Sequence, residues 1–278
     1  MAWKKPFLKY LGNKYKVLDR IMPELEGHAV LHDVFGGSGS VSLNYGGRTV
    51  TYDANPDLVN IYKCVARVGS FSALADSFFV GGNVESIYYQ RREDFNKRPL
   101  RGGMNAWRAA MFLYFNRHGY NGLCRYNLKG GFNVPFGKYK RPYFPADELE
   151  QWCLSMALPL HQFVCDDWRR VMKNAAAGDV AYFDPPYVSP DGGSKGFTAY
   201  NGVSFRWDDQ VALAQAAGLL AQRGVKVVMS NHDTPAIRSV YEQFGVSRVE
   251  SFQVGRSVSR NKDGRRPAQE LLAVWEAR

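Results

Sequence analysis

Long apolar runs are absent from this sequence. No stretch reaches the roughly 18 consecutive apolar residues that a membrane-spanning helix needs, and the opening MAWKKPFLKY lacks the apolar core of a secretory signal. Cysteine is also scarce: four cysteines occur in 278 residues, without a Cys-x-x-Cys pair or a regular spacing to the five histidines. These absences argue against a membrane protein, a disulfide-rich secreted domain and a zinc site. We therefore expect a cytoplasmic protein that holds no metal.

Acidic residues are outnumbered, with 26 Asp and Glu against 36 Lys and Arg and a formal net charge of +10. The whole excess lies between Arg91 and Arg141, where twelve basic residues accompany only two acidic ones, Glu93 and Asp94. Ten aromatic residues share this window. A face that is merely solvated usually mixes both signs of charge, so this basic window favours a polyanionic partner such as a nucleic acid.

Short apolar runs that alternate with helical patterns predict an α/β fold with parallel strands. Strands are expected at 29–34, 48–52, 161–165, 180–183, 225–229, 246–254 and 271–275. Helices are expected at 13–25, 55–69, 106–117, 147–157, 168–176 and 208–222. The part of the basic window that follows 106–117 is dense in Gly, Asn and Pro, which predicts loops and turns. The length suits one catalytic domain with a smaller insertion.

A glycine-rich segment, FGGSG at Phe35 to Gly39, follows the first predicted strand, and Asp53 ends the second. Glycines at a strand-to-helix turn let a ligand approach the backbone, and an acid at the next strand end suits ribose hydroxyls. A dinucleotide is disfavoured, because Ser42 stands where a third glycine is needed. An adenosyl ligand fits better, with its ammonium held by Asp33 or a backbone carbonyl. We expect three glycines to make room for it: Gly36, Gly37 and Gly39. An ordinary tight turn is the alternative.

The tetrapeptide Asp184, Pro185, Pro186, Tyr187 follows an apolar strand, where open α/β sheets bind their ligands. The exocyclic amine of adenine or cytosine is a poor nucleophile because its lone pair is delocalised into the ring. The Asp184 carboxylate and the Pro185 carbonyl can accept its two N–H groups and free that lone pair, while Tyr187 stacks on the base. Attack on an electrophilic methyl group is then catalysed by orientation and electrostatics. The alternative is a simple turn after a strand.

Seven motifs together resemble Dam-type DNA adenine-N6 methyltransferases, which act on GATC. They are FLKYLGNK, FGGSG, NRHGYNGLCRYN, FNVPFGKYKRP, DPPY, FTAY and SNHD, with the acid at Asp53 after the second. The two long loop motifs are specific to that family, whereas DPPY is shared by many amino-methyltransferases. The resemblance implies a seven-stranded Rossmann-like catalytic domain at 1–55 and 145–278, with a target-recognition insertion at 56–144. It also implies S-adenosylmethionine as methyl donor, duplex DNA as partner and a flipped adenine.

Site residues carried over from this resemblance fall into two groups. The cofactor group is Tyr10, Lys14, Phe35, Asp53, Asp166 and Asp184, to which the glycine turn adds its own residues. The DNA group is Lys9, Tyr120, Asn121, Leu123, Arg125, Pro135 and Tyr139. In this interpretation Arg125 bonds a guanine, Leu123 touches a thymine methyl group and Tyr120 fills the gap left by the flipped base. Simple packing of Tyr10 and Leu123 is the alternative. The family usually has Trp at position 10 and Gly at position 13, where this chain has Tyr10 and Asn13.

Two other functions stay open at this point. The same aspartate and carbonyl would activate a cytosine N4 or an RNA adenine, and a protein that keeps the adenosyl fold would only occupy DNA without methylating it. The intact DPPY motif favours an enzyme. We expect a monomer in solution, with room for more than one copy on a DNA molecule.

Overall fold

The computed structural model describes residues 2–67, 69–157, 159–188, 205–254 and 268–278. Within them the strands form one seven-stranded sheet in the order β3-β2-β1-β4-β5-β7-β6. β7 runs antiparallel to both of its neighbours and the other pairs are parallel. This confirms the predicted α/β fold with a mixed seven-stranded sheet. The strands are β1 (Val30–Val34), β2 (Arg48–Asp53), β3 (His161–Cys165), β4 (Val180–Phe183), β5 (Lys226–His232), β6 (Arg248–Val254) and β7 (Ala268–Trp275).

Helices cover both faces of this sheet because its central strands are apolar on both sides. Along β4, Val180 and Tyr182 pack on one face while Ala181 and Phe183 pack on the other. The first face is covered by η1 (Lys14–Val17) and α1 (Leu18–Leu25), with α2 (Ser40–Asn44) beside them. The second face is covered by η3 (Trp168–Arg170), α8 (Val171–Asn174), α9 (Trp207–Gln222) and α10 (Pro235–Gln243).

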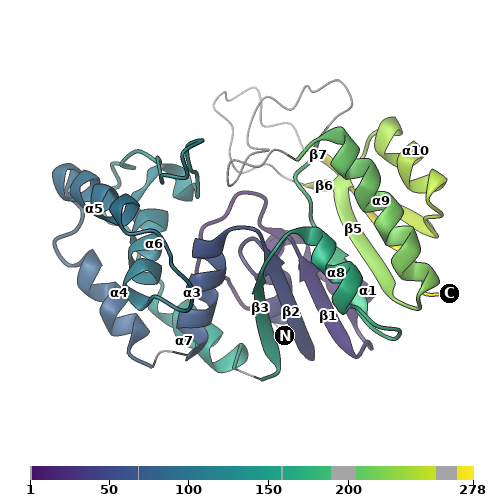
Figure 1. Ribbon diagram of the computed structural model, residues 1–278, viewed down its shortest axis with the longest axis horizontal. Coiled ribbons are helices and arrows are strands. Elements are labelled where there is room, and N and C mark those ends of the chain that lie inside the picture. The colour runs from purple at the N-terminus through teal and green to yellow at the C-terminus, as the bar shows by residue number, and fades with distance from the viewer. Residues whose placement is uncertain (1, 68, 158, 189–204, 255–267) are drawn as a thin grey trace.

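A group of helices stands beside the β3 edge, at the left of Figure 1. Its centre is α6, which is buried from Arg108 to His118. Met111 lies in the core as predicted, whereas Trp107 is only partly buried against it. The helices are α3 (Pro56–Arg67), α4 (Phe71–Phe79), α5 (Glu85–Lys97), α6 (Ala106–His118) and α7 (Ala146–Ser155). After α6, the short η2 (Tyr120–Gly122) leads into a hairpin held by bridges between Gly119 and Phe136 and between Tyr126 and Phe132.

The helix α3 begins directly after Asn55, whose side chain caps it. The Asn55 side chain accepts a hydrogen bond from the Asp57 amide at 3.0 Å, and Pro56 occupies the first helical position. The helix contacts β2, β3, α6 and α7, so it joins the sheet to the helical group. The domain division at 55/56 and 144/145 stays a prediction.

Several elements differ from the expected ones. The predicted helix 13–25 is split into η1 and α1, and 168–176 into η3 and α8. The helices α4, α5 and α10 were not predicted; α5 is mostly polar and buries only Tyr88 and Phe95. Residues 189–196 and 255–267, and the FTAY motif at 197–200, lie outside the described residues. No helix in the described part of the chain is long and apolar enough to cross a membrane.

Candidate active site

The carboxyl ends of three neighbouring strands bring the predicted acids to one edge of the sheet. β1 lies between β2 and β4, with Val34 opposite both Tyr52 and Phe183. The residues that follow continue this pairing, because the Asp184 amide donates to the Val34 carbonyl at 3.4 Å and the Gly36 amide to the Tyr52 carbonyl at 2.8 Å. The glycine turn and the two acids at 53 and 184 are therefore adjacent, as the strand order requires.

The glycines of the turn are required by the packing of the protein itself. A Cβ atom on Gly36 would overlap the Thr51 side chain, and one on Gly39 would lie 2.5 Å from the Trp152 ring. Gly37 has φ +55° and faces the Tyr10 ring, 3.1 Å from where its Cβ would be. These close approaches hold without any ligand. Packing within the protein is therefore reason enough for glycine at these three positions. The expectation that the glycines also make room for an adenosyl group stays a prediction.

Asp33, which is buried, and Asp53, which is partly buried, are carboxylates on either side of this turn. Asp33 accepts hydrogen bonds from the Ser42 amide at 3.1 Å and hydroxyl at 2.7 Å, so it faces the start of α2. Burial raises the pKa of Asp33 to about 7, against the effect of these bonds. Asp53 accepts from the Gly37 and Asn55 amides, and burial raises its pKa to about 6. Among the described residues, no Lys or Arg forms an ion pair with either carboxylate.

Asp184 does have a cation beside it. The Lys14 ammonium lies 2.9 Å from Asp184 Oδ1 and 4.9 Å from the centre of the Tyr187 ring. The Tyr187 hydroxyl is 3.3 Å from the same oxygen and 3.3 Å from Glu270 Oε2. Burial raises the pKa of Asp184, and Lys14 is the main group that lowers it again. Lys14 therefore favours the charged form of this partly buried carboxylate, which is the form that accepts hydrogen bonds. Pro185 is buried, while Pro186 is partly buried.

Three further cofactor candidates lie at the same edge. Tyr10 is partly buried against the glycine turn, and Phe35 takes a left-handed backbone with φ 67°, which is unusual for a residue with a side chain. Asp166 follows Cys165, the partner of Asp53 in the register of β2 and β3. Its side chain is exposed and lies 3.8 Å from Arg170. Asp166 is therefore the least enclosed of the predicted cofactor residues.

The predicted DNA-reading residues gather around η2 and the hairpin. The Lys9 ammonium lies 4.6 Å from the centre of the Tyr139 ring, and the Tyr139 hydroxyl accepts from the Asn121 amide at 2.9 Å. The Tyr120 amide donates to the Pro135 carbonyl at 2.9 Å, and the Tyr120 side chain is exposed. Residues from the N-terminal segment and from both arms of the hairpin thus share one surface.

Arg125 and Leu123 differ in exposure. Arg125 is exposed, and its guanidinium donates from Nε to Asn133 Oδ1 at 2.8 Å, which fixes the direction of the side chain. Leu123 is partly buried against the hydrophobic core, so it is both a packing residue and a candidate for base contact. At Lys9, another of the predicted DNA-reading residues, burial and then the charge of Arg117 lower the pKa of the ammonium group.

Comparison with known proteins decides the family. The family of D12 class N6 adenine-specific DNA methyltransferases matches residues 10–254. This chain belongs to that family. The DNA adenine methylase of Escherichia coli (strain K12) is 41% identical over 99% of this chain and 97% of its own length. The enzyme of Serratia marcescens is 42% identical over 99% and 100%, and that of Vibrio cholerae (El Tor Inaba N16961) 39% over 99% and 97%. The predicted relationship and the enzyme class are confirmed.

Some residues of this methyltransferase's site were not predicted. Glu270 reaches the site from β7, and His232 of β5 packs its ring 4.6 Å from the Tyr187 ring. Asn116 bonds the Lys9 amide and carbonyl and the Gly122 carbonyl, which ties the N-terminal segment to η2. The motifs SNHD and NRHGYNG contain two of these three, so the sequence did carry a signal for them.

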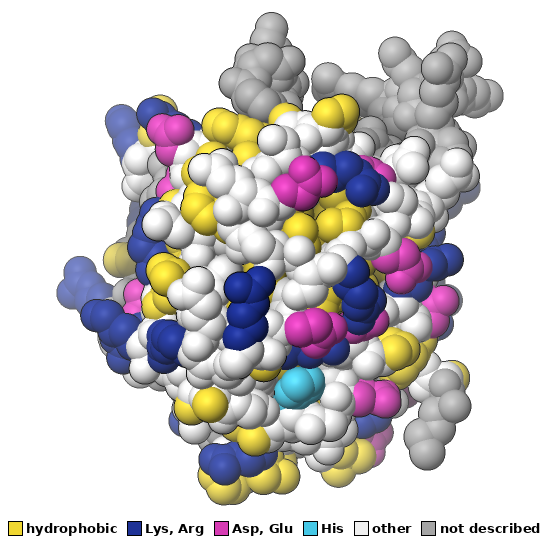
Figure 2. All heavy atoms as spheres, turned by 90° about the vertical axis from the view of Figure 1, so that its right-hand side faces the viewer, with side chains coloured by type: hydrophobic (Ala, Val, Ile, Leu, Met, Phe, Trp, Pro, Cys, Tyr) yellow, Lys and Arg dark blue, Asp and Glu magenta, His cyan; other side chains and the backbone are white. Residues whose placement is uncertain are grey.

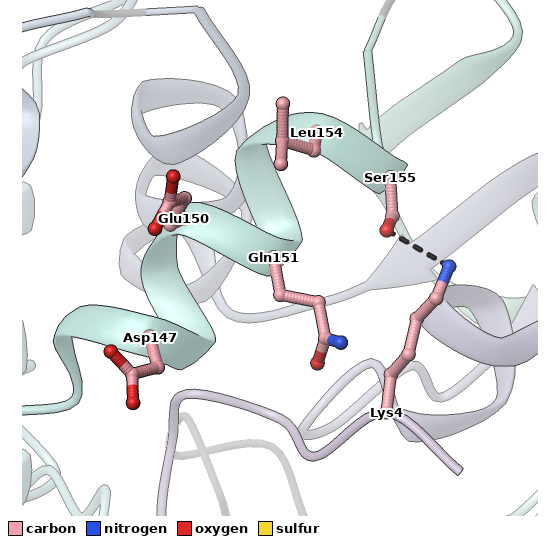
Figure 3. Close-up of a pocket in the computed structure, with 6 residues that line it drawn as sticks. All are labelled: Lys4, Asp147, Glu150, Gln151, Leu154 and Ser155. Atoms are coloured by element: carbon pink, nitrogen blue, oxygen red, sulfur yellow. Dashed lines mark hydrogen bonds between the residues drawn. The ribbon is translucent and has the colours of Figure 1, made fainter. Parts of the chain in front are cut away.

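The methyltransferase also has a hollow of about 340 Å³ beside α7, remote from these contacts. Figure 3 shows Lys4 reaching across it to Ser155, with an Nζ to Oγ distance of 2.9 Å. None of the predicted site residues lines it, and we assign it no part in the reaction. Its lining residues are Lys4, Asp147, Glu150, Gln151, Leu154 and Ser155.

Proposed function

We propose that the chain methylates adenine N6 within GATC in duplex DNA, using S-adenosylmethionine, after the adenine has been flipped out of the helix. Family membership supplies the reaction class. The observation that carries the assignment of the site is the buried Asp184, held by Lys14 at the carboxyl end of β4 and followed by two prolines. The resemblance of the two long loop motifs to Dam-type enzymes supports GATC.

The amine-activating groups are Asp184 and Pro185. Both contacts to the Asp184 side chain within the described residues are made to Oδ1, which leaves Oδ2 for one amine hydrogen. The Pro185 carbonyl accepts the other, and Tyr187 stacks on the base. With both hydrogens held, the nitrogen lone pair is freed for attack on the methyl group that S-adenosylmethionine would supply, with S-adenosylhomocysteine as the leaving group. The nitrogen gives the proton held by Asp184 to that carboxylate as the N6-methyl product forms. Orientation and preorganised charge supply the rate enhancement.

The described residues fit S-adenosylmethionine, which would supply an electrophilic methyl group on a sulfonium ion. Its sulfonium and ammonium are cationic, and among the described residues Asp33, Asp53 and Asp184 together outnumber the cation Lys14 at this edge. A buried excess of carboxylates is stabilised by a positive ligand. Asp53 suits the ribose hydroxyls. The residues proposed to hold the cofactor are Tyr10, Lys14, Asp33, Phe35, Gly36, Gly37, Gly39, Asp53, Asp166 and Asp184.

The hairpin and its surroundings are the proposed DNA interface. Arg125 is exposed and oriented by Asn133, as a bidentate contact to guanine requires. Tyr120 is exposed beside it and fills the gap left by the flipped base. Residues 56–144 form the proposed target-recognition domain, and the protein acts as a monomer. The remaining proposed DNA contacts are Lys9, Asn121, Leu123, Pro135 and Tyr139.

The test is expression in cells that lack adenine methylation. Their DNA is digested with endonucleases that distinguish methylated from unmethylated GATC, and the modified base is identified by mass spectrometry. We expect N6-methyladenine with the unaltered chain, none with Asp184→Ala, and full methylation with the matched control Asp147→Ala, an exposed carboxylate on α7.

Other outcomes would contradict parts of the proposal. N4-methylcytosine would contradict the assigned base, and faster methylation of RNA by the purified protein would contradict duplex DNA as substrate. N6-methyladenine at other sequences would contradict GATC. A folded Asp184→Ala protein with full activity would overturn the mechanism.

A further inference from the structure

Glu270 is a second partly buried carboxylate beside Asp184. Its side chain is 13% exposed, against 19% for Asp184 and 9% for Lys14. Glu270 Oε2 lies 3.3 Å from the Tyr187 hydroxyl and 3.9 Å from the Lys14 ammonium. The same hydroxyl lies 3.3 Å from Asp184 Oδ1. A tyrosine hydroxyl has one hydrogen, so it donates to only one of the two carboxylates at a time.

The sheet fixes Glu270 in this place. β5 and β7 are antiparallel, and Glu270 stands directly opposite His232 at the end of their ladder. Directly opposed residues of an antiparallel pair project from the same face. His232 packs edge-on against the Tyr187 ring at 4.6 Å, while Glu270 meets the hydroxyl of that ring. The directly opposed residues His232 and Glu270 therefore contact the ring and the hydroxyl of Tyr187, respectively.

The choice of acceptor changes what Asp184 can do. A hydrogen bond donated to a carboxylate stabilises its charge and weakens it as an acceptor for a further donor. If Tyr187 donates to Asp184, which Lys14 already contacts, the aspartate binds the target amine less strongly. Glu270 offers the hydroxyl another acceptor and also attracts Lys14.

We propose that Glu270 is a positioning residue, which accepts the Tyr187 hydroxyl hydrogen and so fixes the ring that faces the base while leaving Asp184 its full strength as acceptor. The inference rests on the proposed roles of Asp184 and Tyr187. Glu270 acts through Tyr187 and has no contact with the reacting atoms in this account.

The first test measures single-turnover methylation of a duplex with one GATC site. We expect Glu270→Ala to lower the methyl-transfer rate about tenfold, the usual size for the loss of a hydrogen bond to a charged group. Dissociation constants for DNA and S-adenosylmethionine should stay within about threefold, because the effect is on the chemical step. Glu270→Gln keeps an acceptor oxygen and should keep most of the rate. The matched control is Gln269→Ala, the exposed neighbour on the same strand.

The second test is a double-mutant cycle. In a Tyr187→Phe background no hydroxyl competes for Asp184, so adding Glu270→Ala should change the rate by less than about twofold. If the rate losses of the two single variants multiply in the double variant, Glu270 acts independently of the hydroxyl, and the proposal is overturned. A full rate in Glu270→Ala, or equal losses in the Ala and Gln variants, would also overturn it.

Asp184→Ala separates this proposal from the proposed function. If that variant is inactive while Glu270→Ala is fully active, only the role of Glu270 fails. If Asp184→Ala is itself active, the proposed function of the site fails. Thermal unfolding of each variant checks that it is folded, and Glu270→Leu, which also accepts no hydrogen bond and should lose the rate to the same extent, replaces Glu270→Ala if that variant does not fold.

Discussion

Buried charges are arranged differently in the helical group and at the carboxyl edge of the sheet. In the helical group, Asp57 is bound by Arg108 through Nε at 2.5 Å and Nη2 at 2.8 Å, and also by the Tyr126 hydroxyl at 2.7 Å. The remaining Arg108 nitrogen donates to the carbonyls of Phe95 and Arg98. The charges and hydrogen bonds of this Asp57–Arg108 pair are therefore balanced without a ligand.

The edge of the sheet lacks this balance. Asp33, Asp53, Asp184 and Glu270 are carboxylates, and Lys14 is the cation that contacts the last two. Burial raises the pKa of Asp33, Asp53 and Asp184. The comparison teaches that a balanced buried pair supports the fold, whereas an unbalanced set of acids indicates where a positive ligand binds.

Exposed charges also differ between two parts of the molecule, the side that carries α10 and the basic window from Arg91 to Arg141. The side of the molecule that carries α10 shows Lys and Arg interspersed with Asp and Glu in Figure 2. The window from Arg91 to Arg141 has twelve basic residues and two acidic ones, and Arg98, Arg101, Arg125 and Lys129 are among its exposed cations. Mixed charge suits a solvated surface, while charge of one sign suits DNA phosphates.

The largest expected effect comes from breaking the balanced pair. Arg108→Met leaves Asp57 buried without its cation, and we expect a loss of about 3–5 kcal/mol in the free energy of unfolding. Urea denaturation followed by circular dichroism measures it. Arg108→Met combined with Asp57→Leu removes both charges and should recover most of the loss. A cost below about 1 kcal/mol for the single variant would mean that this pair does little to hold α3 to α6.

The next effect tests the exposed cations. Arg125→Ala should reduce discrimination at one guanine of the target by about 1–3 kcal/mol, because a bidentate base contact is lost. The measurement is kcat/KM on duplexes with single substitutions in GATC. The matched variants Lys129→Ala and Lys140→Ala, which remove exposed charges, should instead weaken all sequences alike and reduce the salt dependence of binding. Equal losses on cognate and altered sites for Arg125→Ala would contradict base reading.

Local sequence patterns predicted the unbalanced edge well. Asp53 and Asp184 each end an apolar run, and the carboxyl ends of parallel strands meet at one edge, so neighbouring positions followed from the pattern. Glu270 could not be found this way. Its place depends on β7 entering the sheet antiparallel between β5 and β6, which no local pattern encodes.

The helical group was harder to predict. The buried helix α6 was expected from its apolar residues, but α5 is polar around most of its surface and gave no helical pattern. Its place is set by Tyr88 and Phe95, which pack in the core shared with α6. The glycine turn was found by composition, whereas its tight packing depends on Trp152 of α7, far along the chain. The contribution of that ring could not be predicted.

A third prediction concerns Lys14, the cation that contacts Asp184 at the unbalanced edge. Lys14 lowers the pKa of Asp184, which burial raises, so Lys14→Met should raise that pKa further. The charged aspartate is the active form, so the acid limb of kcat/KM should move to higher pH. At pH values below the shifted limb, activity should fall about tenfold for each unit of movement and recover as pH rises. Lys226→Met, which breaks a contact with Glu24 far from the site, is the control. An unmoved acid limb would contradict this role of Lys14.

The smallest expected effect is a gain in stability, whereas breaking the pair of Asp57 and Arg108 causes a loss. The pKa of Asp33 is raised to about 7 in the folded protein, from 3.8, so between these values the unfolded chain binds fewer protons and stability falls as pH rises. Asp33→Asn removes the buried charge, and its amide oxygen still accepts both bonds from Ser42. We expect about 1 kcal/mol of added stability at pH 8, or about 2–4 °C in Tm without ligand, and a smaller gain at pH 5. Thermal unfolding at the two pH values measures it. A loss of stability at pH 8 would mean that the Asp33 charge is compensated within the protein, and the edge would then resemble the balanced pair of the helical group.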